Sequence, residues 1–301
     1  MPVTRLGSAA LLTNTLSDVG KTQEKLATMQ MQISSGYKSN NFEGLNGSVE
    51  RFSLLQSQQQ RVGQFLQENA VAKAQLENAD NALGNMVTIS TSLSNLMVQA
   101  RSPSGNSLSF EQQANDLLTA LGVQLNTTSA GQYIFGGTNT ASPPAPDLTV
   151  PTVVTGVPDD GYYKGSKQNT VLSIDDNSQF QFPVRADDIA FQQIIAAVHQ
   201  AVDAYNGKND AGMASALDLM QKGQTALTGA RAKVESSLVN VGDTTTRLTS
   251  LNLYLKGITD NISATDTVAV TTEIANYQAI LQATFQVYSR LSQLRLSDYL
   301  K

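Results

Sequence analysis

Apolar residues recur at alternating spacings of three and four over much of the chain. The longest such pattern runs from Val62 to Ala100, and shorter ones occupy both ends of the chain. This spacing places the apolar side chains along one face of an α-helix. We therefore predict long amphipathic helices in both halves of the sequence and at both termini.

The two terminal patterns form seams with a seven-residue period. The N-terminal seam consists of Leu12, Leu16, Val19, Leu26 and Ile33. The C-terminal seam has a broader apolar face and consists of Ile274, Tyr277, Leu281, Phe285, Tyr288 and Leu291. A lone amphipathic helix of this length has little stability in water, so each seam needs a cover. The seams can pair within one chain or pack on neighbouring subunits, and Gln23 and Gln30 within the first seam favour the second arrangement.

The middle of the chain follows a different pattern. Prolines at positions 143, 144, 146, 151 and 158 exclude a helix there. The short runs TVVTG, GYYKG, NTVLSI and SQFQFPV are rich in β-branched and aromatic residues and are bounded by turn-forming residues. The pattern indicates a small β-rich insertion.

Capping residues indicate where two helices begin. Ser109 is a candidate N-cap, with Gln112 as its partner in a capping box, for a helix that we expect to end at Gly131. Asp187 or Asp188 is a candidate N-cap for the helix after the insertion.

These elements together predict a mainly α fold with a β-rich insertion. The N- and C-terminal halves form a long antiparallel helical-bundle stem, the termini form coiled-coil helices, and a small outward β domain projects from the far end of the stem. The predicted parts are a terminal assembly region, unordered in the free monomer, a helical stem and a β-rich outer domain. The assembly region covers 1–45 and 263–301, the stem covers 46–131 and 186–262, and the outer domain covers 132–185.

Composition excludes several classes of function. The net charge is −5 and only 15% of residues are charged, which argues against general affinity for nucleic acid or an anionic membrane. There is no cysteine, so disulfides, thiolate chemistry and cysteine-ligated metals are excluded. The sequence shows neither a cleavable signal peptide nor an apolar stretch of membrane-spanning length. We expect a cytosolic protein, or one exported without cleavage.

Candidate chemical groups have structural explanations. His199 is the single histidine and lies within an amphipathic helix. The paired aspartates at 159–160, 175–176 and 187–188 fall at predicted turns and at a helix start. The glycine-rich FGGTNT segment lacks the Lys-Ser/Thr of a phosphate loop, and no Lys or Arg occurs between Arg101 and Lys164. We therefore predict no catalytic, cofactor-binding or metal-binding residues. Gly136 and Gly137 are expected to supply positive φ angles beside the packed side chain of Phe135.

Motifs near both termini resemble those of a known family. The segment LTNTLSDVGKTQEKLATMQMQISSG is similar to the N-terminal signature of the flagellin superfamily, whose closing turn here includes Gln32, Ser34, Ser35 and Gly36. The segment EIANYQAILQATFQVYSRLSQLRLSDYL resembles the terminal helix of the same superfamily. The resemblance implies a structural protein of the bacterial flagellum.

Two central motifs resemble those of one branch, the FlgL family of hook–filament junction proteins (hook-associated protein 3). The first motif consists of Phe135, Gly136, Gly137 and Thr138. The second consists of Tyr162, Tyr163 and Gly165. After ISSG the chain continues YKSNNFEGLNG instead of the Arg-Ile-Asn-Ser-Ala stretch common in flagellins, and it lacks the usual flagellin ending. These departures argue against an ordinary filament subunit.

The resemblance to the junction family implies a mechanism. Such proteins leave the cell through the flagellar type III export channel, with their C-terminal helix shielded by the chaperone FlgN. Outside the cell they form a ring on the junction protein FlgK, and flagellin polymerises beyond them. The terminal helices would line the inner tube, the long helices would form its wall, and the β domain would face outward. The alternatives are a flagellin or minor filament subunit, or an unrelated binding protein with a helical stem and a fully ordered monomer.

Overall fold

The structure is a computed structural model that describes residues 3–38, 47–101, 109–150 and 155–299. The chain forms two compact units, one from residues 1–60 with 253–301 and one from residues 61–252. The helices are α1 (Val3–Ser35), α2 (Val49–Ala100), α3 (Phe110–Leu125), α4 (Ile189–Asn206), α5 (Asp210–Ser263) and α6 (Thr267–Tyr299). The strands are β1 (Thr128–Ser129), β2 (Gln132–Tyr133), β3 (Val171–Asp175) and β4 (Ser178–Gln181). The predicted fold class, mainly α with a β-rich insertion, is confirmed.

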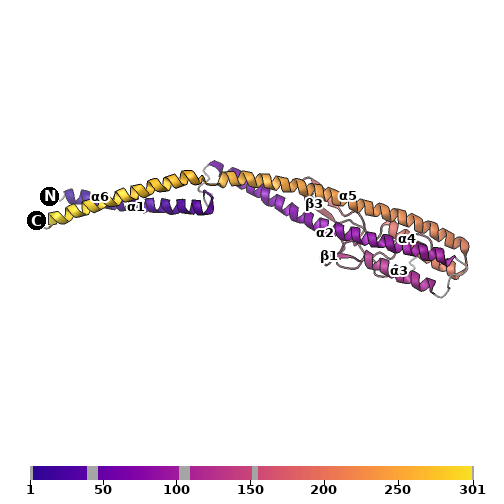
Figure 1. Ribbon diagram of the computed structural model, residues 1–301. Coiled ribbons are helices and arrows are strands. Elements are labelled where there is room, and N and C mark those ends of the chain that lie inside the picture. Colours follow the sequence, from indigo (N-terminus) through magenta and orange to yellow (C-terminus); the bar gives the residue numbers. More distant parts are fainter. Residues whose placement is uncertain (1–2, 39–46, 102–108, 151–154, 300–301) are drawn as a thin grey trace. The chain divides into compact units, whose positions relative to one another are not determined.

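The unit of residues 61–252 is a bundle of helices around one core (Figure 1). The apolar positions predicted on α2 face this core, and Leu76, Leu83 and Met86 are fully buried there. Arg231 of α5 binds Asp80 of α2 through its Nε atom, at 2.8 Å from Oδ1. The apolar period of α2 therefore marks the face of the helix that packs against the core.

Two helix starts illustrate how local chemistry defines the elements. Asp188 is the N-cap of α4, and its Oδ1 accepts a hydrogen bond from the backbone N–H of Ala190 at 3.0 Å. Ser109 stands at the N-cap position of α3, but its hydroxyl accepts a bond from the Gln113 side chain rather than from the backbone. The expected capping box with Gln112 is therefore wrong, since the pairing amide lies one residue later. α3 ends at Leu125 and not at Gly131.

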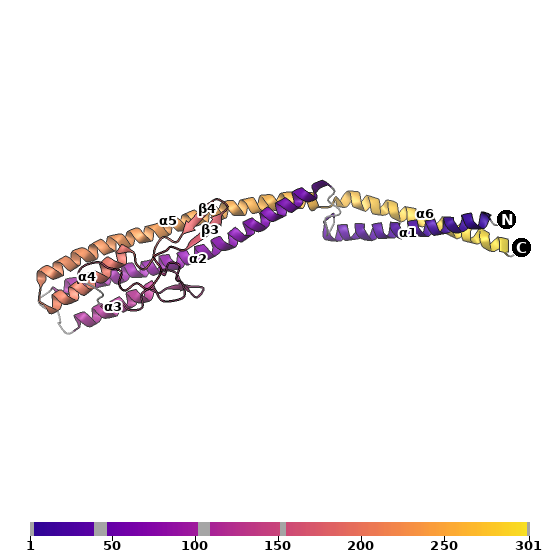
Figure 2. The same ribbon diagram turned by 180° about the vertical axis from the view of Figure 1, so that it is seen from behind.

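The insertion lies along the side of the helices, and the expectation that it projects from the far end of the stem is wrong (Figures 1 and 2). Its buried residues Phe135, Tyr162 and Phe180 belong to the same hydrophobic cluster as the helices. A separate core is not needed because the aromatic side chains are buried against the bundle.

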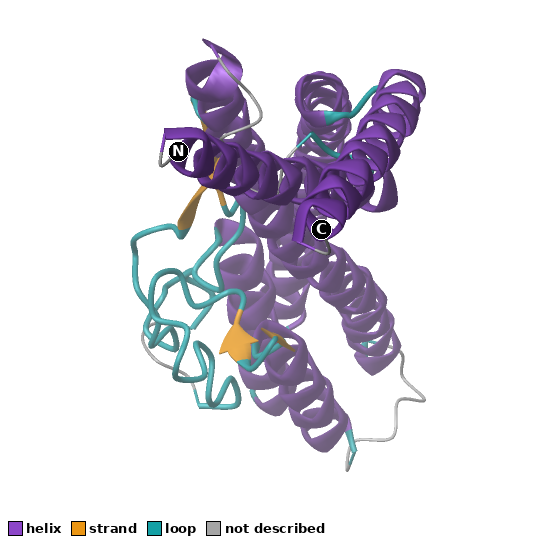
Figure 3. Cartoon of the chain, turned by 90° about the vertical axis from the view of Figure 1, so that its left-hand side faces the viewer, coloured by secondary structure: helices purple, strands orange, loops and turns teal. Residues whose placement is uncertain are grey.

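Strands form only a small part of the insertion, which is mostly loop (Figure 3). β3 and β4 pair antiparallel in the predicted NTVLSI and SQFQFPV runs, with Leu172 opposite Phe180. The GYYKG run is a turn and not a strand. In the TVVTG run, residues 152–154 lie outside the described part of the chain. The two-residue strands β1 and β2, which the sequence analysis did not anticipate, form a second hairpin.

Candidate assembly surfaces

The terminal helices α1 and α6 pack side by side in the unit of residues 1–60 and 253–301. Both chain ends lie at the same end of this helix pair, so the helices are antiparallel (Figures 1 and 2). The Lys25 Nζ atom lies 5.4 Å from the centroid of the Tyr277 ring and 3.4 Å from its hydroxyl. The pair therefore has one defined register.

Half-buried side chains mark the contact between the two helices. On α1 they are Thr15, Val19, Thr22, Leu26 and Met29. On α6 they are Val270, Ile274, Tyr277, Leu281 and Thr284. Both sets keep the alternating spacing of three and four that suits a helix pair.

The predicted seams overlap this contact only in part. Val19 and Leu26 on α1 are half-buried, whereas Leu16 and Ile33 are exposed. Thr22 and Met29 occupy the contact in place of Gln23 and Gln30, which are exposed. The partner helix α6 covers only one side of α1. The half-buried residues therefore include Val19 and Leu26 of the predicted seam, and elsewhere they lie one position before it. The Leu12 side chain lies outside the described residues.

The predicted seam on α6 is also divided. Ile274, Tyr277 and Leu281 are half-buried against α1, whereas Phe285 and Tyr288 are exposed. The side chain of Leu291 lies outside the described residues. The apolar face of α6 thus extends beyond the strip that α1 covers.

Large apolar residues flank the covered strip of α6. Ile280 and Val287 are 52% and 56% exposed and, seven residues apart, share one side of the helix. Phe285 is 52% exposed and lies on the other side of the line through Tyr277 and Leu281. Since α1 reaches only the centre of the face, both flanks remain open to another helix.

The Gln-Ile-Ser-Ser-Gly motif forms the end of α1. Gly36 has a φ of 77°, the left-handed conformation that glycine adopts at helix ends. Its N–H donates to the Gln32 carbonyl at 2.9 Å, and the Gln32 side chain donates to the Lys38 carbonyl at 2.6 Å. Ser34 and Ser35 are exposed, and their hydroxyls bond to nearby backbone carbonyls. The motif therefore ends the helix and turns the chain.

This turn is bonded to the connection between α5 and α6. The Lys38 N–H donates to the Ser263 carbonyl at 2.7 Å, and the Thr265 N–H donates to the Gly36 carbonyl at 2.9 Å. The Lys38 Nζ atom also donates to the Ile262 carbonyl at 3.0 Å. The turn thus fixes where α6 starts relative to the end of α1. The sequence analysis missed Ser263 and Thr265, because backbone groups make these bonds and leave no residue pattern.

The two central motifs bind each other within the insertion. The Ser166 N–H donates to the Gly136 carbonyl at 2.8 Å, and the Thr138 hydroxyl donates to the Ser166 hydroxyl at 2.7 Å. Gly137 has a φ of 66°, and a Cβ atom there would lie 2.2 Å from the Ser166 carbonyl oxygen. The positive φ expected at Gly136 is wrong. Glycine is needed there for space, since a Cβ would lie 2.3 Å from the Asn139 carbonyl oxygen. Residues 136–138 and Ser166 are therefore bonded to each other, and we call this contact the joint.

The paired tyrosines anchor this joint to the bundle. The Tyr162 hydroxyl donates to the Ala186 carbonyl and the Tyr163 hydroxyl to the Ser166 carbonyl, each at 2.7 Å. Burial raises the pKa of Tyr163 to about 12 and raises that of Tyr162 well above its ordinary value. A Cβ at Gly165 would lie 2.4 Å from the Tyr163 ring, which explains the glycine. Both phenols therefore stay protonated and act as hydrogen-bond donors.

The candidate chemical groups make structural contacts. The His199 Nε2 atom lies 3.0 Å from the Leu148 carbonyl, to which it donates, and burial lowers the pKa of the imidazole. The aspartate pairs occupy turns and a cap as expected, but they also form ion pairs that the sequence analysis missed. These ion pairs are Lys167 with Asp160, Arg247 with Asp175, Arg61 with Asp176, and Arg185 with Asp187.

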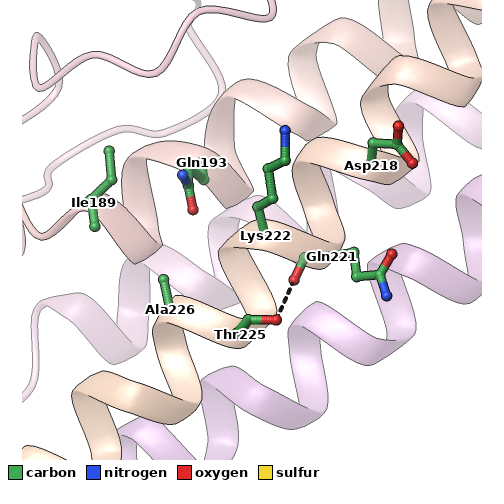
Figure 4. Close-up of a pocket in the computed structure, with 7 residues that line it drawn as sticks. All are labelled: Ile189, Gln193, Asp218, Gln221, Lys222, Thr225 and Ala226. Carbon is green, nitrogen blue, oxygen red and sulfur yellow. Dashed lines mark hydrogen bonds between the residues drawn. The ribbon is translucent and has the colours of Figure 1, made fainter.

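An open surface pocket of about 510 Å³ is lined by residues of α4 and α5 (Figure 4). It is lined by Ile189, Gln193, Asp218, Gln221, Lys222, Thr225 and Ala226. The Thr225 hydroxyl donates to the backbone carbonyl of Gln221 at 3.0 Å, as it does in many helices. One carboxylate and one ammonium group on the same helix supply no nucleophile with an adjacent base.

Metal and membrane sites were sought among the described residues. In residues 3–38, 47–101, 109–150 and 155–299, no group of three or more His, Cys, Asp or Glu side chains is placed to hold a metal ion. Over the same ranges, no helix has the length and hydropathy needed to cross a membrane.

Comparison with known proteins links this geometry to a family. The family described as the bacterial flagellin N-terminal helical region matches residues 8–140, from α1 to the first central motif. The matched region is similar to the N-terminal helical region of bacterial flagellins. A sequence comparison with curated proteins finds no match.

Two solved structures are similar in fold to this chain. FlgL from Bacillus cereus has a TM-score of 0.56 at 19% identity, covering 68% of this chain and 98% of that one. A putative flagellar hook-associated protein from Vibrio parahaemolyticus has a TM-score of 0.60 at 11% identity, covering 73% of this chain and 100% of that one. The fold is thus similar to that of these two proteins.

Proposed function

We propose that this protein is an adaptor at the hook–filament junction of the bacterial flagellum. The observation that carries the proposal is the open apolar surface on both flanks of α6, at Ile280, Phe285 and Val287. Exposed apolar side chains on a helix that already has one partner are typical of an interface with further subunits. The FlgL-like fold and the two central motifs support a junction protein over other flagellar parts.

The proposed partners follow from this role. The protein would form a ring with copies of itself, bind an FlgK-like junction protein on the hook side and contact flagellin on the filament side. Before assembly, the export chaperone FlgN would cover the apolar face of α6. The chain would leave the cell through the flagellar type III apparatus and act outside it, and the absence of cysteine suits passage as an unfolded chain.

Substitution of one flank residue tests the role of α6. Phe285→Asp places a charge on the open flank without entering the contact with α1, so we expect normal folding but loss of junction assembly. Gln282→Asp is the matched control, since Gln282 is exposed and its substitution adds the same charge to the same helix. Complementation of a strain lacking this protein is measured by motility and by filament retention. Normal motility with Phe285→Asp would contradict the proposal.

A filament subunit is the second candidate, because residues 8–140 match the N-terminal region of flagellin itself. Purified protein added to filament seeds distinguishes the two functions. A filament subunit extends the seeds alone, whereas a junction protein caps hook ends and does not elongate them.

A further inference from the structure

The β3–β4 hairpin reaches from the core of its unit toward a thinly packed stretch of α2 and α5. The continuous hydrophobic cluster includes α2 from Ala72 onward and α5 up to Val241. Beyond these points Val62 and Leu248 are buried, but they lie outside the cluster. Residues 61–69 of α2 and 244–252 of α5 therefore contribute no apolar side chain to that cluster.

The hairpin contacts both helices in this stretch. Asp175 ends β3 and Asp176 begins the turn. Asp175 pairs with Arg247 of α5, while Asp176 pairs with Arg61 of α2 at 3.4 Å. The buried side chain of Asn69 on α2 donates to the Ile174 carbonyl at 3.2 Å. The hairpin is anchored on both strands, because Ile174 of β3 and Phe180 of β4 belong to the main cluster.

The two ion pairs differ in strength. The Asp176 and Arg61 side chains are 58% and 60% exposed, so their pairing contributes little to stability. The Asp175 side chain is only 16% exposed, and it makes a charge-assisted hydrogen bond to the Arg247 guanidinium. The contact between Asp175 and Arg247 is therefore the main polar link between the hairpin and α5.

We propose that the β3–β4 hairpin is a releasable clasp, closed by Asp175 and Arg247, that controls local opening of α2 and α5 at residues 61–69 and 244–252. Closed, it holds the two helices together where the core does not. Released, it lets this stretch open while the rest of the unit stays folded. The inference concerns the fold of the unit and does not depend on the junction role.

Hydrogen exchange of the full-length protein, followed by mass spectrometry, tests the clasp. Asp175→Asn removes the charge with little change in shape, and we expect exchange to rise about tenfold in peptides covering 61–69 and 244–252. Peptides covering 76–90 and 224–238 should exchange as in the wild type. Arg247→Gln should reproduce the effect, and the double variant should add nothing further.

Asp80→Asn is the matched control. Asp80 also joins α2 to α5, through Arg231, but within the main cluster. This variant should leave exchange at 61–69 and 244–252 unchanged. In about 1 M salt, where the screening length falls to about 3 Å, the wild type should approach the exchange of Asp175→Asn.

Two results would overturn the proposal. Unchanged exchange at 61–69 and 244–252 in both Asp175→Asn and Arg247→Gln would show that the hairpin does not control this stretch. A uniform rise over all peptides of residues 61–252 would show a loss of global stability instead of local release. Far-UV circular dichroism of each variant establishes that the helices are formed.

Discussion

At the residue scale, the glycines of the insertion illustrate two separate reasons for the absence of a side chain. Gly137 combines a φ of 66° with a backbone oxygen in the space that a Cβ would occupy. Gly131 has a similar φ of 79°, but nothing lies within 4 Å of the corresponding position. Comparing the two positions separates the cost of backbone strain from the cost of a steric clash.

Gly137→Ala should lower the free energy of unfolding by about 2–4 kcal/mol, because strain and clash act together. Gly131→Ala, the control, should cost about 1 kcal/mol from strain alone. Urea denaturation followed by circular dichroism measures both values. Equal losses for the two variants would contradict the steric explanation of Gly137.

His199 of α4 makes the stability of the folded chain depend on pH. Burial, the dominant cause, lowers the pKa of the imidazole below its ordinary value near 6.5. The unfolded chain therefore binds the proton more readily than the folded chain. The resulting stability is fully present above pH 6.5 and is lost as the pH falls through the folded pKa.

A His199→Gln variant tests this dependence. The glutamine amide can donate to the Leu148 carbonyl but does not titrate. We expect the melting temperature of the wild type to fall more steeply between pH 7 and pH 5 than that of the variant, as measured by calorimetry. Parallel curves would indicate that another group causes the acid sensitivity.

At the element scale, the sequence predicted helices well and contacts less well. The apolar period of α2 is long enough to identify both the helix and its buried face, including Leu76 and Met86. The predicted seam of α1 shares Val19 and Leu26 with the contact to α6 but not Leu16 or Ile33, because a heptad shows that a face is apolar and not which part of it a single partner covers. The sequence analysis missed the ion pair of Asp175 with Arg247 and the hydrogen bond of Lys38 to Ser263, because long-range polar contacts leave no periodic pattern in the sequence.

Leu281→Asp should loosen the contact between α1 and α6. Leu281 is half-buried in this contact, so a charge there loses its hydration without gaining a partner. We expect faster cleavage by a protease within residues 3–35 and 267–290, with Gln282→Asp cleaved at the wild-type rate. Thermal unfolding of residues 61–252 should be unchanged, which calorimetry can verify.

At the scale of the whole molecule, the two units differ in how they are packed. The unit of residues 61–252 has an extensive core with many fully buried side chains, whereas α1 and α6 bury their apolar residues only in part. The free subunit should therefore be stable in one unit and easily opened in the other. This difference is consistent with terminal helices that become buried on assembly.

Limited proteolysis of the full-length protein should remove about the first 35–60 and last 35–50 residues quickly and leave a resistant fragment that contains residues 61–252. The fragment is identified by mass spectrometry, and its melting temperature should equal that of the main transition of the intact chain. Termini that resist the protease in a free monomer would contradict the expected order of stability.

The bonds between the two central motifs also have a consequence for how this chain can vary. The hydroxyls of Thr138 and Ser166 lie 2.7 Å apart, so the two ends of the segment between them are held together. Once the ends of a loop are fixed, its free-energy cost rises only slowly with added length. Added length is therefore tolerated only at exposed positions of this segment, because Ala145, Leu148, Tyr162 and Tyr163 within it are buried in the main hydrophobic cluster.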